Sequence, residues 1–377
     1  MFESGEAAKR LGIKVSSLYV YVSRGLLQSH RSPDGRRSLF AVDDVERLAA
    51  SRGERRTGPR NASVTTSITQ ITAAGPSYRG TLASSLLGRR FEDVAELLWQ
   101  SEEAPWPVLT VEVPMGLSLP DRFRATLLGA ARSDPHRFDH RPESVRSSSR
   151  SMIATVVDRL IERSDGIAQS GSTASRIATA MRARGDLAAL TAAVDAVLVL
   201  LADHELASST RAVRLAASTR ADLVDAFLAG TAVAAGPLHG GSGEAVVTFL
   251  RRCSMAGVER VIDEGIRTPG GLPGFGIAIY PAGDPRFSAL RPFVEDVMSD
   301  TERDLFDRVV RSAASHDLPL PSVDLALGAL VSSSGADPAF STAIFTLARM
   351  AGWTAHYLEE LNEPGVRYRA LGAYATR

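Results

Sequence analysis

The sequence predicts a mainly helical protein in which a small basic N-terminal module precedes a much larger all-α body. Residues 1–60 hold 12 Lys/Arg against 7 Asp/Glu, although the whole chain of 377 residues balances 43 basic with 43 acidic residues. Segment 51–61 contains two glycines, a proline and no apolar residue, which indicates a linker. Beyond it, apolar residues recur mostly at helical spacing. We therefore expect the module at 1–50, the linker at 51–61 and the body from residue 62 onward.

The composition excludes several classes of protein. With no net charge, the chain is unsuited to being covered by nucleic acid along its whole length. The single cysteine, Cys253, excludes a disulfide framework and any cysteine-based zinc or iron–sulfur site, and we expect no bound metal. No basic and apolar leader opens the chain, and the most apolar stretch, 187–201, is interrupted by Asp195 and too short to span a bilayer. We expect a cytoplasmic protein that does not enter a membrane.

The N-terminal module has the pattern of a helix-turn-helix. Ser4 can cap a first helix over 5–11, and Gly12 supplies a tight turn. Residues 15–25 then form a second helix with one apolar face. Two short helices joined by a glycine turn are typical of this motif.

A hairpin and a short closing helix are expected after these two helices. Segments 26–28 and 38–40 flank the turn sequence Pro33-Asp34-Gly35, and 42–50 has helical spacing. The runs SGEAAKRLGIKVSSLYVYVSRGLL (4–27) and RRSLFAVDDVERLAA (36–50) resemble the winged helix-turn-helix of MerR-type and excisionase-type proteins.

This resemblance implies DNA binding, with the second helix in the major groove and arginines of the wing on phosphates. A single module makes only a few phosphate contacts, so useful affinity requires a dimer that presents two half-sites. The alternative is a module that only packs or dimerises. The matching positions make the candidate DNA contacts Lys14, Ser16, Ser17, Tyr19, Tyr21, Arg24, Arg31, Arg36 and Arg37.

The body is expected to be all-α, with one exception. Residues 65–72 are rich in β-formers and meet a turn sequence at 73–76, which suits a short hairpin. The polar segment 134–150, with three consecutive serines, predicts a long surface connection. The expected helices are 91–99, 149–162, 187–202, 210–217, 221–235, 244–255, 300–315, 323–331 and 340–361.

Three segments of the body carry residue types suited to chemistry. His204 follows an apolar helix, where a histidine can also serve only to hold the last carbonyl groups. His239 lies among glycines that let a ligand or another backbone come close, and the N-terminus of the next helix favours an anion. Asp324 falls in the first turn of a helix, where a carboxylate is common without any function. Each segment alone is weak evidence.

In their order and spacing, these segments resemble the citrate synthase family over about residues 64–372, which places the body at 62–372. The resemblance implies a two-domain, citrate-synthase-like helical body with a small domain at about 245–340, an active site in the cleft and a homodimer as the catalytic unit. The motifs that carry it are SYRG (77–80), FEDVAELLW (91–99), ADHELASST (202–210), GPLHGGSGEAV (236–246), GFG…Y…DPR (274–286), PSVD (321–324), FTLARMAGWTAHYLEE (345–360) and RYRA (367–370).

The resemblance also implies roles for six residues. Asp324 matches the base that removes a methyl proton from acetyl-CoA, and His239 matches the histidine that hydrogen-bonds the thioester oxygen. The residues that match the oxaloacetate site are His204, Arg286, Arg349 and Arg369, the last contributed by the neighbouring subunit. A dicarboxylate requires several guanidinium groups, and so weak a carbon acid requires both a base and a hydrogen-bond donor. No permanently bound cofactor is implied, since acetyl-CoA and CoA are substrate and product.

One position departs from the family pattern. After GFG the family has a histidine that acts as an acid toward the oxaloacetate carbonyl, and here that position is Ile277. Isoleucine has no proton to give, and loss of a positioned acid costs on the order of 10² to 10⁴ in rate.

Three functions therefore remain open. The first is a slow condensation of acetyl-CoA, or of propionyl-CoA, with oxaloacetate to give citrate or methylcitrate and CoA. The second is a DNA-binding regulator that responds to a dicarboxylate or a CoA ester. The third is a non-catalytic partner subunit in a hetero-oligomer with a fully equipped paralogue.

Overall fold

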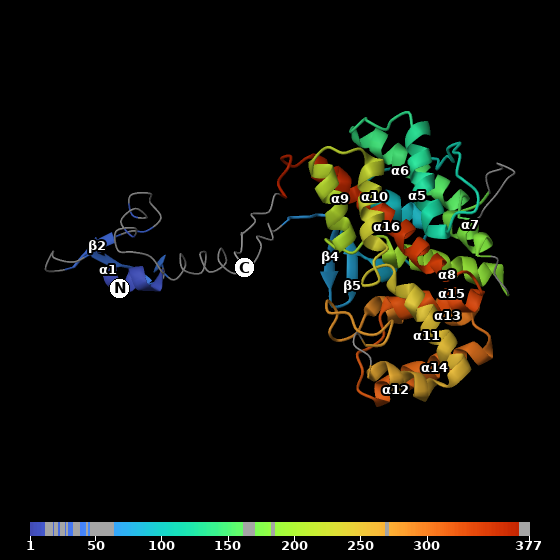
Figure 1. The fold of residues 1–377 in the computed structure, drawn as a ribbon. Coiled ribbons are helices and arrows are strands. Elements are labelled where there is room, and N and C mark those ends of the chain that lie inside the picture. Colours follow the sequence, from blue (N-terminus) through green and yellow to red (C-terminus); the bar gives the residue numbers. More distant parts are fainter. Residues whose placement is uncertain are drawn as a thin grey trace, which may run out of the picture. The chain divides into compact units, whose positions relative to one another are not determined.

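The computed structural model describes residues 1–11, 18, 22, 27, 29–32, 38–42, 44–45, 64–160, 170–181, 185–267 and 271–368. By its contacts the chain divides into two compact units, residues 1–65 with 368–377, and residues 66–367. We call the first the N-terminal unit and the second the body; the body contains the helices from α4 onward in Figure 1. The finer boundaries at 50, 61 and 372 stay predictions.

The N-terminal unit combines one described helix with a small sheet. Its elements are β1 (Phe2–Glu3), α1 (Ser4–Arg10), β2 (Ser29–Arg31) and β3 (Ser38–Phe40), with antiparallel strands in the order β1-β3-β2. Buried Ala7, Leu18 and Phe40 belong to a separate hydrophobic cluster of this unit. The unit therefore has a small core of its own.

Two local expectations for this unit need correction. Glu3, rather than Ser4, is the N-cap of α1, and the Glu6 side chain accepts a hydrogen bond from the Glu3 backbone N–H at 3.1 Å. Ser4 is inside the helix, and its hydroxyl donates to the carbonyl of Ser38 at 3.4 Å. The strand expected at 26–28 is at Ser29–Arg31, where the register pairs residue 31 with residue 38. Most of the second helix, the turn sequence and most of the closing helix lie outside the described residues.

The body begins with the β-hairpin that the sequence predicts. Strands β4 (Thr69–Thr72) and β5 (Gly75–Tyr78) pair antiparallel, with Thr69 opposite Tyr78, and β6 (Thr81–Leu82) adds to β5. A short 3-10 helix, η1 (Ala83–Leu86), follows. This small sheet is the only one in the described part of the body.

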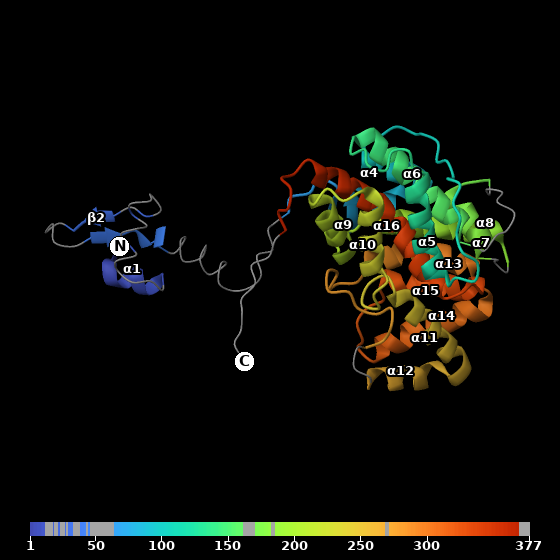
Figure 2. The ribbon, with the colours of Figure 1, turned by 45° about the horizontal axis from the view of Figure 1, so that its top comes forward.

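The rest of the described body is helical, as expected. Figures 1 and 2 show α11 to α15 together at one end of the body. None of the described helices has both the length and the apolar composition needed to cross a bilayer. The helices are α4 (Phe91–Trp99), α5 (Leu119–Ser133), α6 (Pro142–Asp158), α7 (Thr173–Ala180), α8 (Leu187–Leu201), α9 (Ser208–Ser218), α10 (Leu223–Ala234), α11 (Ser242–Ala256), α12 (Val258–Ile266), α13 (Pro285–Val297), α14 (Asp300–Ser315), α15 (Val323–Ser334) and α16 (Ala339–Leu361).

The expectation of a long surface connection at 134–150 is confirmed for residues 134–141 and is wrong for residues 142–150. Helix α6 begins at Pro142, and four of its five serines are buried, while Ser147 is partly buried. The Thr354 hydroxyl donates to the Ser149 hydroxyl at 2.9 Å, and Arg150 makes two 2.7 Å hydrogen bonds to the Glu96 carboxylate. Small and paired polar side chains thus allow α6 to pack against α16 in spite of its polar composition.

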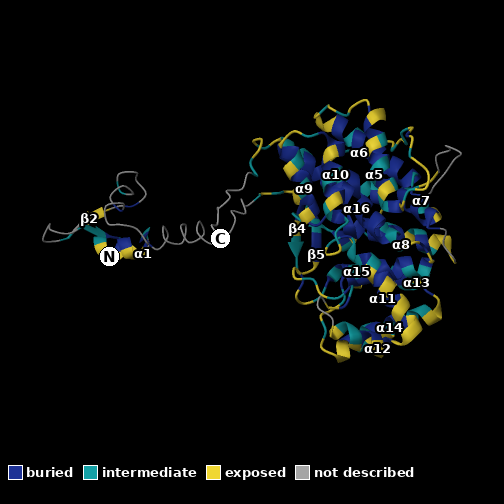
Figure 3. Cartoon of the chain, in the orientation of Figure 1, coloured by how far each residue is buried: buried dark blue, intermediate teal, exposed yellow. Residues whose placement is uncertain are grey.

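Helix α16 is the central element of the body. It contacts α4, α6, α8, α9 and α10, and most of its residues are buried along its whole length (Figure 3). A charged residue in the middle of such a helix requires a partner or a ligand. Arg349, which is buried in the middle of α16, is such a residue.

Candidate active site

Five of the six site residues predicted in the body belong to the described part of the chain, and each comes from a different segment. His204 follows α8, His239 lies in the turn between α10 and α11, and Arg286 is in the first turn of α13. Asp324 is in the first turn of α15, and Arg349 lies in the middle of α16. Arg369 lies outside the described residues.

The segment that carries His204 is held by a buried tyrosine and by α16. The hydroxyl of Tyr78 lies 3.1 Å, 3.0 Å and 3.2 Å from the carbonyl oxygens of Val199, Leu200 and Asp203. The backbone N–H of Gly352 in α16 donates to the carbonyl of Ala202 at 2.9 Å. A Cβ atom on Gly352 would lie only 2.2 Å from Oδ1 of Asp203, so a glycine is required for this approach. The end of α8 is thereby anchored just before His204.

His204 faces a tyrosine from the loop between α12 and α13. Its Nε2 lies 2.9 Å from the hydroxyl of Tyr280, and the two rings meet edge to face at 5.6 Å. The guanidinium carbon of Arg286 lies 5.4 Å from the centre of the same tyrosine ring. Burial lowers the pKa of His204 well below its usual range, and the charges of Arg286 and Arg349 lower it further. His204 is therefore neutral at pH 7.

Asp284 organises this part of the site. Its carboxylate accepts hydrogen bonds from Nε and Nη2 of Arg286 at 2.9 Å and 2.8 Å, and from the Arg286 backbone N–H at 3.1 Å. It also accepts from the backbone N–H of Val323 at 2.9 Å, which joins the N-termini of α13 and α15. Burial opposes the charge of Arg286, but this ion pair raises the pKa of Arg286 overall. Asp284 thus aligns Arg286 and brings the neighbouring Asp324 into the same region.

His239 is held by contacts with α9 and α16. Its Nε2 lies 2.8 Å from the hydroxyl of Ser209, and its ring meets that of Phe345 edge to face at 5.2 Å. A Cβ atom on Gly240 would lie 2.5 Å from the Phe345 ring, which is why the residue after His239 must be a glycine. Burial, followed by the charge of Arg349, lowers the pKa of His239 to about 4. At pH 7 it is a neutral imidazole that can donate one hydrogen bond.

Arg349 is a buried guanidinium with unused hydrogen-bonding capacity. It is 2% exposed, and its Nε and Nη1 have no hydrogen-bond partner in the described part of the chain. Its guanidinium carbon lies 5.1 Å from the centre of the Phe345 ring, so Phe345 contacts both Arg349 and His239. Burial lowers the pKa of Arg349 to about 10, which still leaves it charged at pH 7. A buried cation with free donors is suited to an anionic ligand.

Asp324 lies close to the same groups. Burial raises its pKa above the usual range, although Arg286 and the nearby hydroxyl of Ser242 oppose that rise. The backbone N–H of Ser242 donates to the carbonyl of His239 at 3.0 Å, so the turn that carries His239 also reaches Asp324. A carboxylate of raised pKa is a stronger base than an exposed one.

Ile277 belongs to a loop that packs beside the start of α15. The N–H of Gly276 donates to the carbonyl of Leu320, and the N–H of Ser322 donates to the carbonyl of Gly274, each at 2.8 Å. The N–H of Tyr280 donates to the carbonyl of Ile277 at 3.1 Å, which closes a turn. That turn places Tyr280 against His204. Ile277 is therefore three residues from a phenol that faces the site.

Sequence reasoning overlooked Tyr280, Asp284 and Phe345. Tyr280 and Phe345 lie within quoted motifs, but nothing in the sequence shows what a lone aromatic residue contacts. Asp284 had a local signal, because an aspartate directly before a proline is typical of an N-cap followed by the first residue of a helix.

The nine candidate DNA contacts remain untested predictions. Arg31 is the last residue of β2, and no other member of the set belongs to the described residues. Those outside are Lys14, Ser16, Ser17, Tyr19, Tyr21, Arg24, Arg36 and Arg37.

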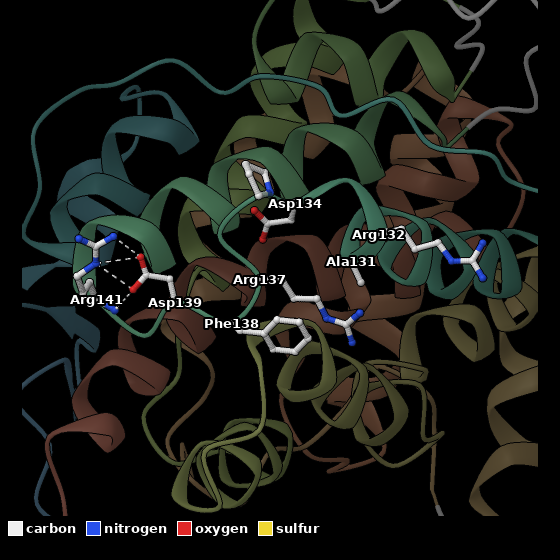
Figure 4. Close-up of a pocket in the computed structure, with 8 residues that line it drawn as sticks. Ala131, Arg132, Asp134, Arg137, Phe138, Asp139 and Arg141 are labelled. Atoms are coloured by element: carbon white, nitrogen blue, oxygen red, sulfur yellow. Dashed lines mark hydrogen bonds and ion pairs between the residues drawn. The ribbon is translucent and has the colours of Figure 1, made fainter.

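A hollow of about 770 Å³ lies elsewhere in the body, where the chain passes from α5 to α6. Figure 4 shows Arg141 turned toward Asp139, and Arg137 beside the exposed ring of Phe138. Arg141 pairs with Asp139 at 2.5 Å and Arg137 pairs with Asp222 at 2.7 Å. The candidate site residues do not line this hollow.

Comparison with known proteins identifies the families. A model of the citrate synthase C-terminal domain matches residues 109–369, and a model of the MerR helix-turn-helix family of regulatory proteins matches residues 2–59. The chain therefore belongs to the citrate synthase family and carries a MerR-type sequence at its N-terminus, as the motifs predict.

Curated relatives are similar over part of their length. The glyoxysomal citrate synthase of Cucurbita maxima is 32% identical over 184 residues, which cover 46% of this chain and 36% of that protein. Citrate synthase 2 of Bacillus subtilis is 33% identical over 180 residues, which cover 46% of this chain and 48% of that protein. The chain thus matches less than half of the length of these relatives.

Solved structures share the fold. The citrate synthase of Thermoplasma acidophilum, solved with carboxymethyl coenzyme A and oxaloacetate, has a TM-score of 0.64 at 23% identity and covers 85% of this chain and 96% of its own. That of Pyrobaculum aerophilum has a TM-score of 0.64 at 21% identity and covers 93% and 95%. The expectation of a mainly helical, citrate-synthase-like fold is confirmed, whereas the winged form of the N-terminal module stays a prediction.

Proposed function

We propose that the body catalyses a citrate synthase-like condensation of an acyl-CoA with oxaloacetate. The observation that carries this proposal is the buried guanidinium of Arg349, close to the carboxylate of Asp324, with two nitrogen atoms that have no hydrogen-bond partner among the described residues. Arg286, aligned by Asp284, supplies a second buried cation. Two guanidinium groups suit the two carboxylates of oxaloacetate.

In this proposal Asp324 and His239 activate the acyl-CoA. Asp324 removes a proton from the methyl group, and the burial that raises its pKa makes it a better base. His239 is neutral and donates a hydrogen bond to the thioester oxygen as that oxygen gains enolate character. The enol carbon then attacks the ketone carbon of oxaloacetate. Water later cleaves the carbon–sulfur bond of the citryl thioester and releases CoA.

Tyr280 is proposed to supply the proton that Ile277 lacks. Its hydroxyl lies 2.9 Å from His204, among the residues assigned to oxaloacetate. Burial raises the pKa of Tyr280 to about 12, which is still below the value of about 15.7 for water, a model for an alcohol. Transfer of the phenolic proton to the new alkoxide is therefore favourable, although less so than transfer from an imidazolium. This difference is consistent with a slow enzyme.

A CoA-release assay tests the proposal. Purified protein is mixed with oxaloacetate and acetyl-CoA, and then with propionyl-CoA in place of acetyl-CoA. We expect slow CoA release that depends on oxaloacetate and rises in Ile277→His. Ile279→His is the matched control, because residue 279 is an exposed isoleucine of the same loop and its replacement should not raise turnover. Absence of turnover in both wild type and Ile277→His would exclude a condensing enzyme.

A homodimer with shared sites is the proposed assembly, since Arg369 matches an arginine contributed by the neighbouring subunit. Mixing inactive Asp324→Asn with inactive Arg369→Ala tests this. If each site uses Arg369 from the other subunit, mixed dimers contain one intact site and regain part of the activity. No recovery after subunit exchange would show that the sites are not shared.

DNA binding by the N-terminal unit is a second proposal, supported by the MerR match at residues 2–59. Deletion of residues 1–60 should abolish a salt-dependent mobility shift of operator-like DNA while leaving CoA release unchanged. A shift that survives the deletion, or no shift by the full chain, would contradict DNA binding by this unit.

A further inference from the structure

A cluster of buried ionisable side chains adjoins the segment that carries His204. It consists of Asp203 just after α8, Arg214 of α9, and His356 and Glu360 of α16, and all four side chains are completely buried. Burial of charge is costly, and apolar residues of similar volume often stabilise a core equally well. The proposed condensation uses none of these four groups. Their contacts nevertheless lead to the candidate active site.

Arg214 determines how His356 forms its hydrogen bonds. A guanidinium group can only donate, and Nη1 of Arg214 lies 3.0 Å from Nδ1 of His356, so Nδ1 accepts. The proton on Nε2 is therefore directed to Oδ2 of Asp203, at 3.3 Å. Arg214 is itself held by the carboxylates of Glu359 and Glu360, at 2.6 Å and 2.9 Å. The cluster thus sets the direction in which His356 donates.

The carboxylate of Asp203 fixes the backbone on both sides of His204. Its Oδ2 accepts a hydrogen bond from the backbone N–H of Glu205 at 3.0 Å, which closes a turn around His204. Glu205 has a φ of +53°, in the left-handed region that few residues other than glycine adopt. Such a conformation persists only where surrounding contacts hold it. One oxygen of Asp203 therefore bonds both to His356 and to the turn that orients His204.

Helix α16 links this turn to Arg349. Gly352, whose N–H donates to the segment before His204, and His356 are four residues apart and lie on one face of α16. Arg349 is three residues before Gly352 and shares this face. The bond from His356 to Asp203 therefore helps to set the spacing between His204 and Arg349. Such spacing matters, since a misplacement of about 1 Å can cost about 10²-fold in rate.

We propose that His356 is a positioning residue of the oxaloacetate site. It donates to Asp203, and Asp203 holds the turn that directs the imidazole of His204 toward Tyr280 and the ligand. This inference rests on the proposed function, because that function assigns His204 to oxaloacetate. Loss of the bond to Asp203 should raise KM for oxaloacetate and leave KM for the acyl-CoA unchanged.

Two polar replacements separate the two hydrogen bonds of His356. The amide of asparagine takes the place of Nδ1 and reaches only Arg214, whereas the longer glutamine brings its amide nitrogen near the place of Nε2 and can donate to Asp203. Calorimetry on the intact protein should show oxaloacetate binding about tenfold weaker than wild type in His356→Asn, and within about threefold of wild type in His356→Gln.

Thr354→Val is the matched control. Thr354 is completely buried in the same helix, and its hydroxyl donates to Ser149 of α6 rather than to the segment of His204. Its replacement should lower the melting temperature and leave the dissociation constant of oxaloacetate unchanged.

Hydrogen exchange tests the turn without any ligand. The N–H of Glu205 is protected by its bond to Asp203, so exchange in segment 203–207, measured by mass spectrometry, should be about tenfold faster in His356→Asn than in wild type. In His356→Gln and Thr354→Val this segment should exchange as in wild type. Unchanged exchange in α14 would show that the effect is local.

The outcomes separate this inference from the proposed function. Wild-type exchange of segment 203–207 in His356→Asn, or equally weakened oxaloacetate binding in His356→Asn and His356→Gln, would overturn the positioning role. Faster exchange with an unchanged dissociation constant would show that His356 only stabilises the turn, which also refutes the proposal. If wild type binds no oxaloacetate, the proposed function fails and the role toward oxaloacetate fails with it, whereas the exchange rates still decide whether His356 holds the turn.

Discussion

Replacement of Tyr280 by phenylalanine isolates the contribution of one hydroxyl group. The ring contacts with His204 and Arg286, at 5.6 Å and 5.4 Å, are retained, and only the 2.9 Å hydrogen bond to His204 is lost. His204 is 9% exposed, so its Nε2 is left nearly without water. The unfolding free energy should fall by about 1–3 kcal/mol, the usual cost of an unsatisfied buried polar group.

The expected kinetic effect of Tyr280→Phe is larger. If the phenol protonates the new alkoxide, kcat should fall by about 10² to 10⁴, which corresponds to roughly 3–5 kcal/mol of activation free energy. KM for oxaloacetate should change much less, because Arg286 and Arg349 hold the carboxylates. The CoA-release assay measures both quantities under initial-rate conditions.

The double variant Ile277→His/Tyr280→Phe provides the control. With an imidazole restored at position 277, the loss caused by Tyr280→Phe should shrink by at least tenfold. An equal loss in both backgrounds would show that Tyr280 only positions His204. A wild-type kcat in Tyr280→Phe would refute the assignment altogether.

Further perturbations address the other assigned groups. Asp324→Asn should lower kcat by about 10² to 10⁴ while calorimetry shows nearly unchanged oxaloacetate binding; retained turnover would show that Asp324 is not the base. Asp284→Asn leaves the guanidinium of Arg286, which is 4% exposed, without its carboxylate partner. Urea unfolding should show that the free energy of unfolding falls by about 3–5 kcal/mol. A decrease below about 1 kcal/mol would contradict the positioning role of Asp284. Burial lowers the pKa values of His204 and His239 in the folded protein. As pH falls, these histidines therefore take up protons in the unfolded chain before they do so in the folded protein. The free energy of unfolding should consequently decrease as pH drops from about 6.5 toward 4. The melting temperature should therefore depend less on pH in His239→Gln than in wild type. An equal dependence on pH in the two proteins would show that protonation of His239 does not cause the loss of stability.

Local signals predicted many of the helices well. Helix α14 was expected at its observed bounds because its start is encoded locally: the Ser299 hydroxyl accepts from the Glu302 N–H, and the Glu302 side chain accepts from the Ser299 N–H. Helix α4 was likewise expected at Phe91–Trp99. Where the capping residues and the spacing of apolar residues agree, the sequence alone is sufficient to predict where a helix begins and ends.

Elsewhere local composition was misleading. Helix α13 was missed, and it contains Pro292, which normally interrupts a helix. The first half of α6 is rich in serine and arginine, and this composition predicts a loop instead of a helix. Both helices depend on packing and on partners distant in the chain, such as Glu96 for Arg150.

The amino-acid order alone predicted the chemical types at the site: two histidines, a carboxylate and three arginines, in the order that the citrate synthase family shares, with isoleucine at position 277. Only the tertiary structure decided which neighbours these groups have. Tyr280 reaches His204 across 76 positions, and Asp284 reaches the N–H of Val323 across 39. Such contacts depend on how helices pack and how buried polar groups are satisfied, and neither periodicity nor composition specifies the partner of a given side chain.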